Sequence, residues 1–195
     1  MAVAGVLLTA SLVLAIAMAS YQPTDPSLNT AAGGPVRNLF GLPGAWLADL
    51  MLSFGGPAAA LGLPLMFILG MRLARSEPMP NWRRLALATL AGVVLVDVAL
   101  ALLRGGAFTG LPAGLGGLFG MGGAAIAGGL TDLAPPSVGV PLRYTLMAIF
   151  AGSGLALIIL GLGLEPEEWS QLLRRRLMVN ADEYEEEEES GEAVD

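Results

Sequence analysis

Residues 85–103, LALATLAGVVLVDVALALL, run from Arg84 to Arg104 without a basic residue and with a single acid, Asp97. A helix crosses the hydrocarbon core of a bilayer with about 20 largely apolar residues. This stretch is therefore predicted to be a transmembrane helix. Three further apolar stretches have similar lengths and lie at about 1–20, 48–71 and 142–164. We expect an all-α membrane domain of four transmembrane helices over residues 1–165.

Tryptophan and tyrosine side chains support these span boundaries, because both prefer the level of the lipid headgroups. Five of the six lie next to the end of a predicted span, namely Tyr21, Trp46, Trp82, Tyr144 and Trp169. Hydropathy and aromatic placement together therefore support four spans better than hydropathy alone.

The composition indicates a lipid environment and excludes several kinds of chemistry. The chain is 54% hydrophobic and 14% charged, which is too apolar for a single soluble core. It contains no Cys, His or Lys, which excludes thiol nucleophiles, histidine acid–base catalysis, Cys/His zinc sites and the lysine-containing P-loop. We expect no catalytic residue, no cofactor and no metal ligand in this chain.

The net charge of −7 describes the C-terminal tail rather than the membrane domain. Nine of the seventeen acids lie in residues 182–195, so the rest of the chain has ten arginines and eight acids. Residues 181–195 are predicted to be a disordered acidic linker, because they have almost nothing to bury. A composition so typical of a linker suggests that the chain continues in a longer protein.

The segment at 166–180 is predicted to be a short cytoplasmic amphipathic helix. Trp169, Leu172, Leu173 and Leu177 share one face at helical spacing. We expect this face to lie on the membrane surface, with the arginines 174–176 touching lipid headgroups. The predicted lipid contacts are Arg174, Arg175 and Arg176.

A fifth uncharged stretch, residues 105–131, contains 11 glycines and Pro112. Glycine costs about 0.8–1 kcal/mol per helical position relative to alanine, so this stretch would make a poor spanning helix. A fifth span would also place the arginines 174–176 outside, against the positive-inside rule. We predict a Gly-rich interfacial or re-entrant segment before the last span, with a fifth span as the alternative.

The arginines of the loops favour a topology with both ends in the cytoplasm. Seven would lie inside, namely Arg72, Arg75, Arg83, Arg84 and Arg174 to Arg176, and three outside, namely Arg37, Arg104 and Arg143. The small residues at 17–19 resemble a signal cleavage site, but residues 1–19 lack the positive charge of a secretory signal. We therefore expect the first span to stay uncleaved.

Asp97 is the ionisable residue placed well inside a predicted span. Such a residue costs about 2.5–3.5 kcal/mol by insertion scales and is a functional candidate by default. A proton or ion pathway is one interpretation. The absence of an intramembrane Arg or Lys favours a role in packing or assembly.

Small residues four apart also allow close helix contacts, at Ala58/Gly62, Ala88/Gly92 and Gly116/Gly120. Pro57 and Pro64 predict a kink in the second span.

The connection between the first two spans is dense in residues that fix turns. Residues 20–30 read SYQPTDPSLNT, and Gly41, Pro43 and Gly44 precede the second span. Asp, Asn and Ser side chains in such segments bond to nearby backbone, and proline presets its own backbone angle. We expect an ordered external loop, with a simple connector as the alternative.

Two segments of this region, YQPTDPSLNT at 21–30 and NLFGLPGAWLAD at 38–49, resemble the four-span N-terminal domain of the FtsK/SpoIIIE family of bacterial DNA translocases. The resemblance covers most of residues 1–177 in the order of the spans. The residues of the family motif in the external loop are Tyr21, Pro23, Asp25, Pro26, Asn29, Gly41, Gly44, Trp46 and Asp49. The family usually has a short basic segment before the first span, whereas this chain begins inside the apolar stretch.

The resemblance implies a non-enzymatic anchor in the bacterial cytoplasmic membrane, at the division septum, that contacts membrane proteins of the division machinery. In that family an ATP-driven motor ring follows a cytoplasmic linker and moves chromosomal DNA. The resemblance therefore implies a homo-oligomer in the full-length protein, with ATP and DNA bound only by the motor. None of the family's nucleotide- or DNA-binding residues has a counterpart in this chain. The alternatives are a small transporter or channel using Asp97, and a membrane scaffold unrelated to DNA.

Overall fold

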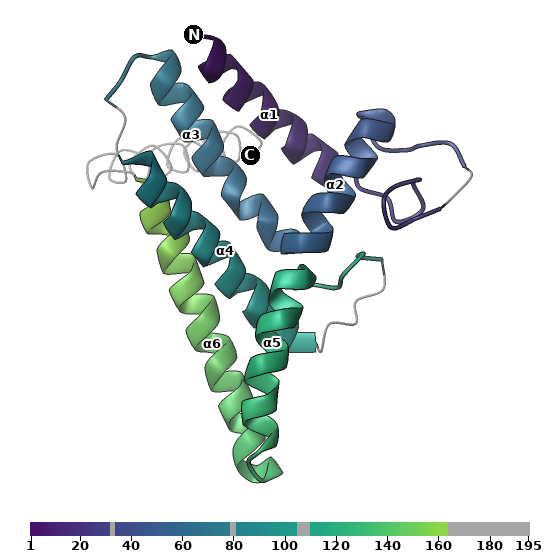
Figure 1. Cartoon of the computed structure of the whole chain (residues 1–195), viewed down its shortest axis with the longest axis vertical. Helices are drawn as coiled ribbons and strands as arrows, with labels where there is room; N and C mark the ends of the chain where they lie inside the picture. The colour runs from purple at the N-terminus through teal and green to yellow at the C-terminus, as the bar shows by residue number, and fades with distance from the viewer. Residues whose placement is uncertain (32–33, 79–80, 105–109, 164–195) are drawn as a thin grey trace, which may run out of the picture. The chain divides into compact units, whose positions relative to one another are not determined.

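The described part of the chain is built from helices, and a long loop connects the first two (Figure 1). The computed structural model describes residues 1–31, 34–78, 81–104 and 110–163, and no strand occurs among them. The helices are α1 (Ala2–Ala19), α2 (Gly41–Gly55), the 3-10 helix η1 (Pro57–Gly62), α3 (Leu63–Ala74), α4 (Trp82–Arg104), α5 (Gly117–Asp132) and α6 (Pro136–Gly161). Residues Met1–Leu162 form one compact unit.

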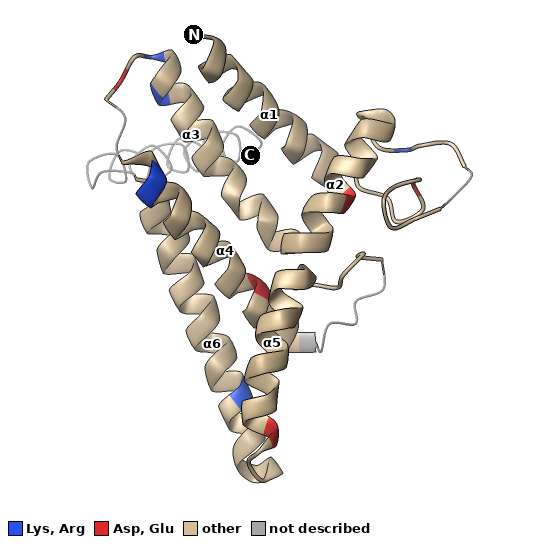
Figure 2. Cartoon of the chain, viewed as in Figure 1, with Lys and Arg blue, Asp and Glu red and all other residues tan. Residues whose placement is uncertain are grey.

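Four of the described helical segments are long and apolar enough to cross a membrane. They are Ala2–Ala19, Pro57–Ala74, Trp82–Leu103 and Pro136–Gly161. The all-α membrane fold with four spans is therefore confirmed. Charged residues lie mostly at helix ends and in loops, and α1 carries none (Figure 2). Apolar side chains along the spans are exposed, as expected for surfaces that face lipid.

The second span differs from its predicted position at 48–71, because this stretch is not one helix. Helix α2 ends at Gly55, and the chain turns at Gly56 into η1 and α3. Gly56 has a positive φ of 50°, and an added Cβ there would lie 2.5 Å from the carbonyl oxygen of Leu115. Pro57 then begins η1, where its missing N–H costs little. The predicted kink is a break between two helices, and the apolar span is Pro57–Ala74.

The last span also begins earlier than predicted. Helix α6 starts at Pro136 rather than near 142, and Pro141 lies inside it. Most of the Gly-rich stretch before it is a regular helix, α5, which packs against α4 and α6. With 16 residues, α5 is shorter than the roughly 20 that a full span needs. Residues 105–109 lie outside the described part of the chain, and a re-entrant path for this segment stays a prediction.

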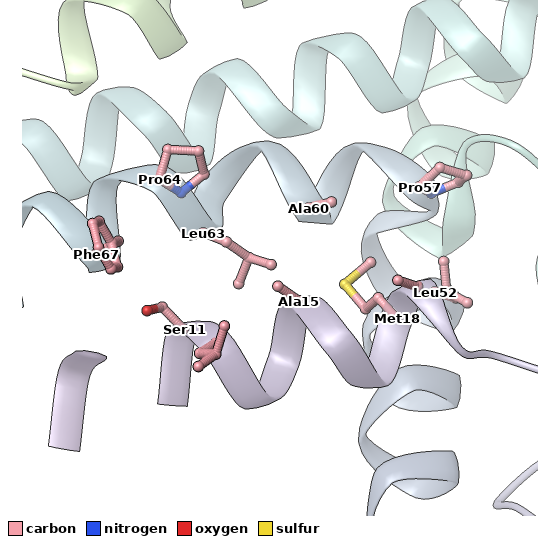
Figure 3. A pocket seen from close by; sticks show the side chains of 11 residues that line it. Ser11, Ala15, Met18, Leu52, Pro57, Ala60, Leu63, Pro64 and Phe67 are labelled. Carbon is pink, nitrogen blue, oxygen red and sulfur yellow. The ribbon is translucent and has the colours of Figure 1, made fainter. Parts of the chain in front are cut away.

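Helix α4 packs against α6, α5 and η1. Helix α1 packs against α3 and α2 (Figure 3). Glycines allow the backbones to approach closely. An added Cβ at Gly92 would lie 2.6 Å from the carbonyl oxygen of Gly154, and one at Gly120 would collide with the carbonyl oxygen of Asp97. Two of the predicted small-residue pairs, Ala88/Gly92 and Gly116/Gly120, thus contain glycines at helix contacts within the chain, whereas Gly62 faces open space.

The predicted amphipathic helix at 166–180, its lipid-contacting arginines Arg174, Arg175 and Arg176, and the acidic linker at 181–195 all lie outside the described residues. These remain predictions.

Candidate functional site

The loop between α1 and α2 turns its polar side chains inward. Asp25 is 2% exposed and lies at the centre of the loop. Its Oδ1 accepts a hydrogen bond from the backbone N–H of Arg37 at 2.9 Å, and its Oδ2 accepts one from the N–H of Asn38 at 2.8 Å. One carboxylate therefore holds two successive amides from the far side of the loop.

Asn38 connects the end of α1 to the start of α2. Its side-chain N–H groups donate to the carbonyl oxygens of Ala17 at 2.8 Å and Ser20 at 3.4 Å. These carbonyls belong to the end of α1, where a helix leaves acceptors without partners. The side-chain oxygen of Asn38 accepts from the N–H of Phe40 at 3.1 Å. An added Cβ at Gly44 would collide with this oxygen, so the glycine leaves room for the amide.

The first half of the loop is fastened to α2 at a second point. The backbone N–H and the side-chain amide of Asn29 both donate to Oδ2 of Asp49, at 3.2 and 3.0 Å. The same amide donates to the hydroxyl of Ser53 at 2.7 Å. Asp49 is fully buried, and its Oδ1 has no hydrogen-bond partner in the described part of the chain. The loop is thus closed on α2 by side chains twenty or more residues apart in sequence.

The remaining motif residues lie around this network. Gly41 has a φ of 62° and donates its N–H to the carbonyl oxygen of Asn38 at 2.8 Å, which begins α2. Pro23 is exposed and Pro26 half-buried. Trp46 is 46% exposed on α2. Partial burial, followed by the nearby carboxylates of Asp49 and Asp25, raises the pKa of Tyr21 above its ordinary value, so the phenol stays neutral at physiological pH.

An apolar surface borders the folded loop. It is formed by exposed side chains at the start of α2 and just before it, namely Leu39, Phe40, Leu42, Trp46, Leu47 and Leu50. We call these six residues the α2 surface. The site therefore combines an ordered polar loop with an exposed apolar surface.

The chain matches the family model of the 4TM region of DNA translocase FtsK/SpoIIIE over residues 2–159. The chain belongs to this family. It is 34% identical to the DNA translocase FtsK of Azospirillum brasilense over 167 residues, which is 84% of this chain and 25% of the relative. With the FtsK of Caulobacter vibrioides the identity is 36% over 121 residues, covering 60% of this chain and 15% of the relative.

A third relative, the DNA translocase FtsK of Vibrio parahaemolyticus, is 46% identical over 61 residues, or 30% of this chain and 6% of the relative. The chain therefore spans a quarter or less of the length of these FtsK proteins. No solved structure matches the chain at a significant level. The predicted membership in the FtsK/SpoIIIE family is confirmed by residues that include the whole loop between α1 and α2.

Asp97 lies apart from the loop network of this FtsK region. It is fully buried in α4, and neither carboxyl oxygen has a hydrogen-bond partner in the described chain. Gly116, directly before α5, and Gly120 of α5 pack on its backbone, and an added Cβ at Gly55 would lie 3.5 Å from its Oδ2. Asp97 therefore occupies the point where the end of α2 and the start of α5 meet α4. This position favours a role in packing.

The side chains of Asn38 and Ser53 take part in these hydrogen bonds, although neither residue was among the predicted site residues. Asn38 lies in the segment at 38–49 that resembles the family. Its position shortly before the helix that begins at Gly41 could have indicated a role at the start of that helix. The sequence around Ser53 contains nothing that indicates its hydrogen bond with Asn29 of the loop. The hydrogen-bonded loop therefore contains side chains beyond the predicted motif residues.

Proposed function

We propose that the chain is the membrane anchor and interaction module of a DNA translocase that acts in cell division and chromosome partition. Its family and the names of its relatives support the translocase. The four spans would hold the protein in the bacterial inner membrane. The anchor has no catalytic role in this proposal, and ATP and DNA would be bound by a motor elsewhere in the full-length protein.

The folded loop between α1 and α2 carries this proposal. A connector needs no internal structure, yet this loop buries Asp25 and Asn38, hydrogen-bonds both side chains, and is fastened through Asn29 to the buried Asp49 of α2. The effect is a rigid rim beside the α2 surface. We propose that other division proteins bind this rim and surface, with the exposed Leu39 and Trp46 as apolar anchors.

The proposed orientation has both ends in the cytoplasm and the loop outside. Four arginines flank the turn between α3 and α4, namely Arg72, Arg75, Arg83 and Arg84. Among the described residues of the loop between α1 and α2, Arg37 is the only arginine. The positive-inside rule therefore supports placing the α3–α4 turn in the cytoplasm. Tethering at the septum would raise the local concentration of the motor without contact between this domain and DNA.

The test is the localisation of the full chain fused to a fluorescent protein. We expect a signal at the division septum, and we expect the double variant Leu39→Ser/Trp46→Ser to stay in the membrane but lose septal enrichment. Leu133→Ser is the matched control, because Leu133 is equally apolar and 85% exposed but lies in the turn between α5 and α6. A diffuse membrane signal for the unaltered chain would contradict the proposal.

The transporter or channel alternative depends on Asp97, whose buried and unpartnered carboxyl is the observation in its favour. A conducting carboxyl requires a relay of polar groups or water. Here the backbone of Asp97 is covered by Gly116 and Gly120. We therefore expect no pH-dependent flux in liposomes containing the chain. Flux that is abolished by Asp97→Asn would favour the alternative.

A further inference from the structure

A groove of about 280 Å³ lies where the end of α4 meets α5 and α6. Small residues of α5, including Ala124 and Gly128, form one wall, and Leu102 of α4 contributes to another. Asp132 of α5 and Arg143 of α6 also line it, so the groove contains one acid and one base. It is separate from the loop between α1 and α2, and none of its lining residues belongs to that loop.

Arg143 is held in place but keeps binding capacity. Its Nε and Nη2 donate to the carbonyl oxygen of Leu102, at 2.9 and 2.6 Å. This carbonyl belongs to the last turn of α4, whose acceptors lack partners within the helix. The third nitrogen, Nη1, has no hydrogen-bond partner among the described residues. A guanidinium fixed in this way offers N–H donors to an anion such as a phosphate, with little further loss of side-chain freedom.

Asp132 provides the opposite charge in an electrostatically unfavourable place. It is the last residue of α5, where the helix dipole favours a cation and disfavours an acid. Its side chain is exposed and makes no ion pair with any described residue. A cationic group bound beside it would offset both the dipole and the negative charge. The acid therefore gives the groove a negative charge that complements a bound cation.

The depth of the groove indicates what kind of ligand reaches it. The span Trp82–Leu103 has 22 residues and is about 33 Å long, which is enough to cross a hydrocarbon core of about 30 Å. Leu102 lies at the end of this span, and its bond to Arg143 places the guanidinium at the same level. The groove is thus at the lipid headgroups when α4 crosses the membrane.

We propose that this groove binds the headgroup of an ethanolamine phospholipid. Arg143 donates to the phosphate, and Asp132 accepts hydrogen bonds from the primary ammonium group. A phosphocholine headgroup has a phosphate but no ammonium N–H, and a phosphoglycerol headgroup has no cation. The volume is slightly below the range of about 300–1,000 Å³ that holds drug-sized ligands, so it suits a headgroup rather than a whole lipid.

The test uses the full chain in nanodiscs of mixed lipids, with the lipids retained by the protein counted by native mass spectrometry. We expect phosphatidylethanolamine to be retained roughly tenfold over phosphatidylcholine, the ratio for one charge-assisted hydrogen bond. Asp132→Asn should remove this preference, and Arg143→Gln should reduce retention of both lipids. Glu77→Gln is the matched control for the acid, because Glu77 is exposed in the turn between α3 and α4.

Three results would overturn the proposal. The first is equal retention of the two lipids by the unaltered chain. The second is an unchanged preference in Asp132→Asn, a variant that breaks no hydrogen bond or ion pair among the described residues. The third is full competition by soluble glycerophosphoethanolamine at the concentration of the lipid, because the site would then bind a free phosphate ester rather than a membrane lipid.

Discussion

The loop between α1 and α2 and the packing of α4 with α5 and α6 are held together by different physics. In the loop, buried side chains donate and accept hydrogen bonds over distances of many residues, as Asp25 and Asn38 do. Between the helices, glycines such as Gly92 and Gly120 bring backbones into contact. Lipid provides no hydrophobic drive between helices, so close packing must supply the attraction there. The loop lacks this packing, and hydrogen bonds between buried polar groups hold it together instead.

The largest effect is expected from adding bulk at the helix contacts. Gly120→Val would place side-chain atoms on the carbonyl oxygen of Asp97 and force α5 away from α4. Overpacking of this kind costs about 1–3 kcal/mol, and a backbone obstacle places it at the upper end. Thermal unfolding of the purified chain in detergent measures the loss.

Gly129→Val is the control for this variant, because Gly129 lies on the same helix and an added Cβ there meets nothing within 4 Å. Both variants add the same β-branched side chain to α5, so the difference between them isolates the helix contact. Equal loss of stability in the two variants would show that the glycines do not mediate the packing.

The next largest effect is expected in the loop. Asn38→Ala removes the donor to Ala17 and Ser20 and the acceptor for Phe40. A buried polar group left without a partner costs about 1–3 kcal/mol. We expect the loop to open locally, seen as faster hydrogen exchange at residues 37–41, while the helices keep their protection. Gln22→Ala, an exposed loop residue, should leave exchange unchanged. Unfolding of the whole domain by Asn38→Ala would mean that the two regions are not separable.

One substitution made in both regions sharpens the comparison. Asp25→Asn replaces a carboxylate oxygen that accepts from an amide with an NH₂ group, so it should cost about 1–3 kcal/mol. Asp97→Asn breaks no hydrogen bond seen in the described chain, and it replaces an ionisable group with a neutral one of the same shape. We expect its stability to equal or slightly exceed that of the unaltered chain. A strong destabilisation by Asp97→Asn would reveal a partner for this carboxyl outside the described residues.

The smallest effect concerns the fastening of the loop on α2. A double-mutant cycle with Asn29→Ala and Ser53→Ala should give a coupling of about 0.5–1 kcal/mol, as for one partly exposed hydrogen bond. The measurement is the unfolding free energy of the four proteins in the cycle. Additive effects would show that the bond contributes nothing to closing the loop.

The sequence predicted the helical class and the four spans, because a lack of charge over some 20 residues is a strong local signal. It misplaced the second span, although the Gly55–Gly56–Pro57 sequence marks the break that the structure contains. It also did not predict that part of the Gly-rich stretch forms the regular helix α5. Glycine propensities measured in water ignore the close contacts that Gly116 and Gly120 make with α4.

In the candidate site the sequence predicted an ordered external loop, but it did not predict what the side chains of this loop contact. Asp25 and Asn29 were predicted to lie in an external loop, and the structure shows them directed at the backbone of residues 37–38 and at α2. Contacts between residues 12 to 24 positions apart depend on the path of the loop, which local turn chemistry cannot determine. Ser53 illustrates this limit, since its partner Asn29 lies across the whole loop.

The central claim is a multi-pass anchor that displays the ordered loop outside and the turn between α3 and α4 inside. Because the chain has no cysteine, Thr24→Cys and Glu77→Cys can be made singly and labelled in intact cells with a membrane-impermeant maleimide. Both positions are exposed, one in the loop and one in the turn. The account predicts labelling of Thr24→Cys without permeabilisation and of Glu77→Cys only after it. External labelling of Glu77→Cys, or protection of Thr24→Cys, would contradict it.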